Sequence, residues 1–167
     1  MRRTLLVVDI QNTYFSRGAL PLWRAEAVEE RIVAAIGAAH AAGDQVVLVR
    51  HVSAGGPFAE DDPGSVVRPA IMAAAPGAPI ITKSFPDAFQ DTDLGAQLLD
   101  TGELLICGMM TQNCVTYTAL SAEAALLDRR VIADLCTAPT ELVHQIAVAA
   151  LASKMPVVNA GDLWSLG

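Results

Sequence analysis

Aromatic and basic residues are scarce in this sequence. Aromatic residues make up only 5% of the 167 positions, and 11 lysine and arginine residues stand against 18 aspartate and glutamate residues, which gives a formal net charge of −7. A nucleic-acid-binding protein needs a basic face that displaces counterions from phosphates, and anionic membrane surfaces attract clusters of lysine and arginine. The basic pairs here are Arg2-Arg3 and Arg129-Arg130. We therefore expect neither a nucleic acid nor a membrane as a partner.

Long apolar runs and paired cysteines are also missing. A membrane-spanning helix requires roughly 18–20 apolar residues, which no run in this sequence reaches, and the apolar stretch before Asp9 is too short for a signal peptide. The three cysteines, Cys107, Cys114 and Cys136, show no Cys-x-x-Cys spacing. An odd number of cysteines without that spacing argues against a disulfide framework or a zinc site, so we expect a reducing, cytoplasmic location.

Short apolar runs alternate with alanine-rich segments of helical spacing. Hydrophobic residues amount to 53% of the chain, which suffices for a core, and the length fits one domain over residues 1–167. Buried strands are predicted at residues 5–8, 46–49, 79–81, 104–107, 131–133 and 156–158. Helices are predicted at residues 25–42, 94–99, 114–127 and 140–152. This alternation predicts an α/β fold with a parallel sheet.

The longest segment without a regular pattern runs from about His51 to Pro79. It contains Gly-Gly-Pro, Asp-Asp-Pro-Gly and Pro-Gly sequences, which are typical of turns. Loops of this length in compact domains often act as lids over a site. A surface loop without a function fits the sequence equally well.

Three reactive side chains follow predicted strands. Asp9 ends the first, Lys83 follows the third, and Cys114 comes after the fourth and a turn of six residues. Open parallel sheets bind ligands beyond the carboxyl ends of their strands. A carboxylate, an ammonium group and a thiol meeting there would serve as base, electrostatic stabiliser and nucleophile. The plainer alternatives are a turn-capping acid, a solvated lysine and a buried apolar cysteine.

The segment Gly-Met-Met-Thr-Gln-Asn-Cys, which ends at Cys114, carries most of this information. A cysteine at the start of a helix meets unpaired backbone N–H groups and the positive end of the helix dipole. Both favour the thiolate and predict a lowered pKa for Cys114, and the same N–H groups can form an oxyanion hole. A redox pair between Cys107 and Cys114 is disfavoured by the six residues between them.

Three segments together resemble the isochorismatase-like cysteine hydrolases, a family that includes nicotinamidases and N-carbamoylsarcosine amidohydrolase. They are Leu-Val-Val-Asp-Ile-Gln-Asn (6–12), Lys-Ser-Phe-Pro-Asp-Ala-Phe (83–89) and Ile-Cys-Gly-Met-Met-Thr-Gln-Asn-Cys-Val (106–115). The resemblance implies a three-layer, doubly wound fold around a six-stranded parallel sheet in the order 3-2-1-4-5-6. It also implies a homo-oligomer, either a dimer or a tetramer.

The resemblance further implies a catalytic triad of Asp9, Lys83 and Cys114. A non-proline cis peptide bond is implied between Met109 and Met110, with the backbone N–H groups of Met110 and Cys114 as the oxyanion hole. Metal-binding nicotinamidases carry an Asp-x-His sequence after the second strand, where this chain has Arg50-His51-Val52. We therefore expect no metal and no other cofactor.

Amide hydrolysis is the function that these residues favour. We expect a small-molecule substrate whose C–N bond is cleaved through a thioester on Cys114. Vinyl ether hydrolysis of the isochorismatase type and a non-catalytic, ligand-binding relative are the alternatives. The side chains proposed to line the substrate pocket are Gln11, Phe15, Phe85, Phe89 and Tyr117.

Overall fold

The strands form one six-stranded parallel sheet. The computed structural model describes residues 2–165. Its strands are β1 (Arg2–Val8), β2 (Gln45–His51), β3 (Ile80–Lys83), β4 (Thr101–Met109), β5 (Asp128–Thr137) and β6 (Val157–Val158). They pair in the order β3-β2-β1-β4-β5-β6, and every adjacent pair is parallel. The predicted fold class and strand order are confirmed.

The central strands are apolar because both of their faces are covered. In β1 every residue from Thr4 to Val8 is buried, and in β4 every residue from Leu104 to Met109 is buried. The edge strand β3 instead alternates between exposed and buried positions, which is the pattern of a strand with one covered face. Burying each large aliphatic side chain contributes about 1.5–3 kcal/mol, so the sheet centre carries much of the stability.

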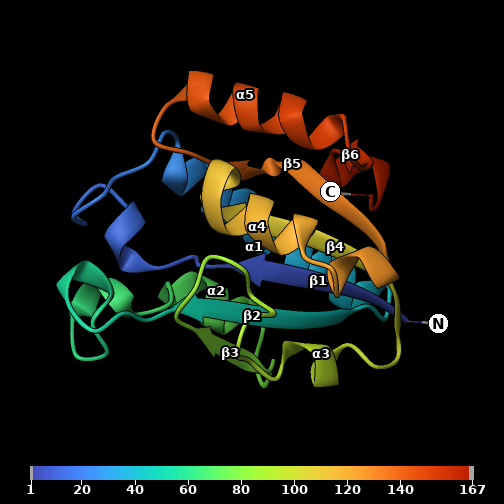
Figure 1. The fold of residues 1–167 in the computed structure, drawn as a ribbon, viewed down its shortest axis with the longest axis horizontal. Helices are drawn as coiled ribbons and strands as arrows, with labels where there is room; N and C mark the ends of the chain where they lie inside the picture. Colours follow the sequence, from blue (N-terminus) through green and yellow to red (C-terminus); the bar gives the residue numbers. More distant parts are fainter. Residues whose placement is uncertain (1, 166–167) are drawn as a thin grey trace.

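Helices cover both faces of the sheet, with α1 behind it and α4 in front of it in the view of Figure 1. They are α1 (Ala25–Ala41), α2 (Pro69–Ala74), α3 (Leu94–Gln97), α4 (Thr116–Leu120) and α5 (Glu141–Ala152). One side of α1 is buried through Val28, Ile32, Ala35, Ile36 and Ala39. The Thr140 side chain caps α5 by accepting a hydrogen bond from the Val143 N–H. No helix within residues 2–165 is long and apolar enough to cross a membrane.

The helix predicted at residues 114–127 is wrong. A π-helical turn (Thr111–Val115) comes first, α4 ends at Leu120, and a separate 3₁₀ turn covers Ala124–Leu126. Ser121 breaks the helix, because its backbone is extended and its hydroxyl donates a hydrogen bond of 2.7 Å to the Glu123 carboxylate. Serine competes for local hydrogen bonds in this way and favours helix ends.

The segment between His51 and Pro79 contains more structure than its sequence suggested. It holds two 3₁₀ turns, Gly56–Phe58 and Pro63–Ser65, followed by α2. Pro69 begins α2, a position that suits proline because its missing N–H would be unpaired there in any case. In Figure 1 the two 3₁₀ turns lie at the left, beside the loop that follows β1 and beyond the carboxyl ends of the strands, whereas α2 lies nearer the centre of the view.

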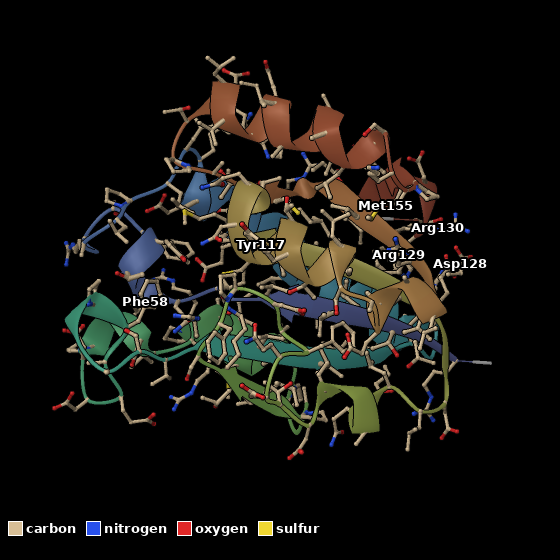
Figure 2. All side chains as sticks on the ribbon, viewed as in Figure 1. Phe58, Tyr117, Asp128, Arg129, Arg130 and Met155 are labelled. Atoms are coloured by element: carbon tan, nitrogen blue, oxygen red, sulfur yellow. The ribbon has the colours of Figure 1, made fainter. Side chains whose placement is uncertain are left out.

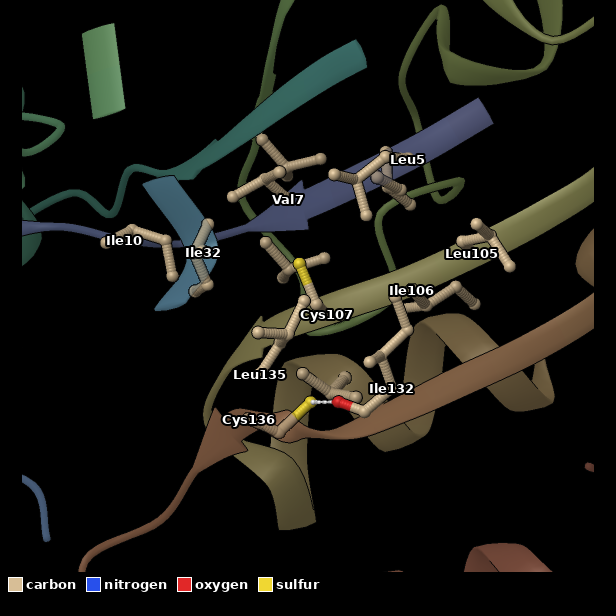
Figure 3. Packing of buried hydrophobic residues seen from close by; sticks show 14 of the residues in the cluster. Leu5, Val7, Ile10, Ile32, Leu105, Ile106, Cys107, Ile132, Leu135 and Cys136 are labelled. Atoms are coloured by element: carbon tan, nitrogen blue, oxygen red, sulfur yellow. Dashed lines mark hydrogen bonds between the residues drawn. The ribbon is translucent and has the colours of Figure 1, made fainter. Parts of the chain in front are cut away.

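All three cysteines are buried, and Cys107 and Cys136 lie on strands in the interior of the sheet. Cys107 on β4 packs among apolar side chains, and the Cys136 thiol on β5 donates to the Ile132 carbonyl oxygen, as the dashed line in Figure 3 shows. Burial raises the pKa of Cys107 well above its ordinary value and that of Cys136 to about 12. Both are inert thiols at neutral pH.

Gly108 sets how closely β4 can approach β1 beside Asp9. Its φ is +122°, and a Cβ atom there would lie 2.1 Å from the Val8 carbonyl oxygen. We expect Gly108→Ala to lower the free energy of unfolding by at least about 2 kcal/mol, since a strained φ and a backbone clash combine. Gly37→Ala is the matched control, because Gly37 lies in α1 with open space around it. That change should raise stability by about 0.5–1 kcal/mol, and urea denaturation measures both.

Candidate active site

Asp9 lies where β1 leaves the sheet. Its N–H still donates to the Val49 carbonyl oxygen of β2, but its φ is +54°, in the left-handed region that non-glycine residues rarely adopt. The side chain is fully buried. A strained backbone and a buried carboxylate at a sheet edge are typical of a functional position.

Lys83 ends β3, and its side chain reaches Asp9 at the end of β1. The residue is 1% exposed, which is exceptional for lysine. Its Nζ lies 2.8 Å from Asp9 Oδ2 and 3.2 Å from Cys114 Sγ. One ammonium group thus joins the carboxylate of the first strand to the thiol that follows the fourth strand.

Cys114 lies in the π-helical turn that connects β4 to α4. The turn is closed by a hydrogen bond of 3.3 Å from the Val115 N–H to the Met110 carbonyl oxygen, and the Thr116 hydroxyl donates to the Thr111 carbonyl oxygen at 2.6 Å. The peptide bond between Met109 and Met110 is cis. The structure therefore brings together the three side chains that the sequence placed after separate strands.

Burial and the neighbouring Asp9 carboxylate favour the protonated form of the Cys114 thiol. Burial and the Asp9 carboxylate raise the pKa of Cys114 to about 12, although Lys83 lowers it. The predicted lowering of this pKa is therefore wrong, because burial and a neighbouring negative charge outweigh the helix start. The thiol is protonated at neutral pH beside an Asp9–Lys83 ion pair.

The Asp9 carboxylate is enclosed beside Lys83. Its Oδ2 forms an ion pair with Lys83 at 2.8 Å, and both carboxylate oxygens are buried without a hydrogen-bond partner among residues 2–165. Burial lowers the pKa of Lys83, whereas the Asp9 carboxylate and Cys114 raise it by more than burial lowers it. The pKa of Lys83 is therefore above its ordinary value. A permanent ammonium group therefore balances the negative charge, whether it resides on Asp9 or on the sulfur.

The predicted pocket residues differ in placement. Gln11 is fully buried and bound to backbone: its Oε1 accepts from the His51 N–H at 2.8 Å, while its Nε2 donates to the carbonyl oxygens of His51 at 2.9 Å and Ser65 at 2.7 Å. These hydrogen bonds favour a structural role for Gln11 over the predicted contact with a substrate. Its side chain holds the end of β2 and the following loop in place.

Two of the four predicted aromatic residues are buried and two are exposed. Phe89 is buried, and Phe15 is buried beneath the Arg68 guanidinium group, 4.1 Å from its ring centre. Phe85 and Tyr117 are 41% and 56% exposed. Tyr117 lies on α4, where Figure 2 labels it, and its exposure does not fit a buried pocket wall.

A cavity of about 830 Å³ lies between the loop after β1 and the loop after β2. It is lined by Asn12, Thr13, Phe15, Ser16, Arg17, Gly18, Ala19, Glu26, Pro57, Asp62, Pro63, Gly64 and Arg68. No triad residue is among them, and Phe15 is the predicted pocket residue that lines it. The cavity therefore adjoins the loops of the site without containing its reactive atoms.

Three residues of the site were missed by the sequence reasoning. The Lys83 Nζ lies 3.2 Å from His51 Nδ1, the His51 ring meets Phe58 edge-on at 5.2 Å, and Phe58 in turn meets Tyr14 at 5.4 Å. Figure 2 shows Phe58 among the loops at the carboxyl ends of the strands, far from Asp128 and Arg130 at the other end. His51 could have been found from its place at the end of the second strand.

Tyr14 is electrostatically coupled to the reactive groups. It is 2% exposed, and burial, followed by the neighbouring Asp9 carboxylate, raises its pKa. The phenol is therefore neutral at neutral pH and can donate a hydrogen bond.

Among residues 2–165 there is no group of three or more His, Cys, Asp or Glu side chains that could hold a metal ion.

This combination of fold and site has counterparts among known proteins. The family model described as the isochorismatase domain matches residues 3–161. The chain belongs to the isochorismatase family. Membership of this family, together with the similarity to known hydrolases, indicates that the chain is a hydrolase. An uncharacterized isochorismatase family protein of Bacillus subtilis is 30% identical over 166 residues, which span 90% of this chain and 92% of that protein.

Two further comparisons agree with this membership. A streptothricin hydrolase of Streptomyces noursei is 35% identical over 124 residues, which cover 72% of this chain and 44% of that enzyme, so the match spans less than half of its length. The crystal structure of an isochorismatase from Pseudomonas putida is 26% identical, with a TM-score of 0.86 over 97% of this chain and 90% of that one.

Proposed function

We propose that this isochorismatase-family member is a cysteine hydrolase that cleaves the C–N bond of a small amide through a thioester. The observation that carries the proposal is the contact of one buried lysine with both a carboxylate and a thiol, at 2.8 Å and 3.2 Å. A thiol whose pKa is about 12 needs a base to become a nucleophile, and Asp9 is the base within reach.

Acylation begins with proton transfer from the Cys114 thiol to Asp9 as sulfur attacks the carbonyl carbon. The carbonyl oxygen gains the negative charge, and the backbone N–H groups of Met110 and Cys114 are the proposed donors that stabilise it. As the tetrahedral intermediate collapses, the C–N bond breaks and Asp9 returns its proton to the leaving amine. The product is a thioester on Cys114.

Deacylation repeats the steps with water. Asp9 accepts a proton from a water molecule as that water attacks the thioester carbonyl carbon, and the C–S bond breaks to release the carboxylic acid. The proton on Asp9 then returns to the sulfur. Lys83 remains positively charged throughout and offsets whichever neighbour is anionic, which is the role that its raised pKa supports.

A substrate panel tests this proposal. Primary amides, N-carbamoyl compounds and streptothricin are incubated with the protein, and ammonia or amine release is measured, with isochorismate as a vinyl ether comparison. We expect turnover of at least one C–N substrate, and a covalent adduct on Cys114 when the acidified reaction is analysed by intact mass. Turnover of isochorismate alone, without an adduct, would replace the proposal with vinyl ether hydrolysis. Binding without turnover of any compound would favour the non-catalytic alternative.

A further inference from the structure

His51 contacts the triad but takes no part in the reaction steps above. It is paired with Lys83 in the register of β2 and β3, and both residues end their strands. Its Nδ1 lies 3.2 Å from Lys83 Nζ. An ammonium group has three donors and no acceptor, so the contact requires an unprotonated Nδ1 that accepts.

The Lys83 ammonium group then has three close neighbours, one by an ion pair and two by hydrogen bonds. Asp9 Oδ2 lies at 2.8 Å, Cys114 Sγ at 3.2 Å and His51 Nδ1 at 3.2 Å. A lysine side chain has many rotamers, and each hydrogen bond removes some of that freedom. With only the carboxylate and the thiol as acceptors, the third N–H of a 1% exposed ammonium group would lose a partner.

His51 is itself held firmly. Its backbone N–H and carbonyl oxygen both bond to the Gln11 side chain, at 2.8 Å and 2.9 Å, and its ring meets Phe58 edge-on at 87°. Lys83 at the end of β3 and Asp9 directly after β1 are the charged groups that act on its ring. Arg50, the preceding residue, bonds Thr82 and Glu60 instead.

We propose that His51 is a positioning residue whose neutral imidazole fixes the Lys83 ammonium group between Asp9 and Cys114, so that protonation of His51 switches the enzyme off. The inference rests on the proposed function for its effect on turnover, but the Lys83–His51 coupling can be measured without a substrate. Burial and Lys83 lower the pKa of His51, with Asp9 opposing them. The neutral form therefore persists below pH 6.5, and activity is expected to fall only at more acidic pH.

The coupling is tested by NMR titration of the imidazole resonances. In Lys83→Met the pKa of His51 should rise, because the positive charge of Lys83 lowers this pKa in the wild type. If that variant fails to fold, the Asp9→Asn/Lys83→Met double variant should show a rise as well, because the effect of Lys83 on His51 is larger than the opposing effect of Asp9. His144 is the internal control: its pKa is lowered by burial and opposed by Glu141, and Lys83 is not among the causes. An unchanged His51 titration, or equal shifts at both histidines, would overturn the proposal.

The positioning role is tested by two substitutions with different chemistry. His51→Phe keeps a ring against Phe58 without an acceptor, whereas His51→Asn keeps a short acceptor that does not titrate in this range. A misplaced catalytic group can cost up to about 100-fold, so we expect His51→Phe to lower kcat by about 10- to 100-fold with KM nearly unchanged. His51→Asn should retain activity within a few-fold and extend it to lower pH. His40→Asn, at an exposed position of α1, is the control that should change neither.

The outcomes separate this role from a structural one. Equal losses in His51→Phe and His51→Asn, with a lowered unfolding midpoint in both, would assign His51 to stability and overturn the proposal. Wild-type kinetics in both variants would overturn it as well. If no C–N substrate is found but the titration shift occurs, the proposed function fails while the Lys83–His51 coupling stands.

Discussion

Replacing Cys114 by alanine is expected to reduce kcat by at least about four orders of magnitude while the fold persists. Loss of a covalent nucleophile removes the only route through the thioester, and such losses commonly reach this size. The stability cost should stay near 1 kcal/mol, because a small thiol is exchanged for a methyl group at a 3% exposed position. Amine release under saturating substrate and urea denaturation measure the two quantities.

Cys107→Ala is the matched control for this experiment. It removes another fully buried thiol, on the strand that leads to the active-site turn, so its effect on the free energy of unfolding should be similar. Its kcat should stay within a few-fold of wild type, because Cys107 packs in the core rather than against Lys83. Residual activity near wild type in Cys114→Ala, or a comparable loss in Cys107→Ala, would contradict the thioester mechanism.

The fold could be predicted because its signals are local and strong. The apolar runs that form β1 and β4 are buried on both faces, and such strands read as continuous apolar stretches. The order of the strands came from the resemblance rather than from these patterns. The helix predicted at residues 114–127 failed because alanine-rich composition conceals a break at Ser121.

The sequence could predict which reactive residues form the site, but not their protonation states or all of their side-chain contacts. Asp9, Lys83 and Cys114 follow strands whose carboxyl ends meet at one sheet edge, so their convergence was foreseeable. The protonation state of Cys114 was not, because it depends on burial and on the distance to Asp9, which no spacing reveals. The same holds for His51, whose contact with Lys83 arises from the pairing of β2 with β3.

Asp9→Asn and Lys83→Met are expected to abolish hydrolysis while moving the pKa of Cys114 in opposite directions. Asp9 raises this pKa and Lys83 lowers it. Removing the carboxylate should therefore lower the pKa of the thiol and leave a thiolate–ammonium pair, whereas removing the ammonium group should raise it further. Alkylation by iodoacetamide between pH 6 and 10, with labelling located on Cys114 by peptide mass, should be faster than wild type in Asp9→Asn and slower in Lys83→Met.

The stability of these variants distinguishes a disrupted site from a misfolded chain. Removing one member of a buried ion pair leaves the other charge unpaired and typically costs about 3–5 kcal/mol, whereas replacing both members is often close to neutral. The Asp9→Asn/Lys83→Met double variant should therefore unfold at a higher urea concentration than either single variant, while remaining inactive. A recovery of stability in the double variant, together with opposite shifts of the alkylation rate in the two single variants, would assign the role of base to Asp9 and that of electrostatic stabiliser to Lys83. Equal shifts in the two single variants, or an additive loss of stability in the double variant, would show that Asp9 and Lys83 do not act on Cys114 as a pair.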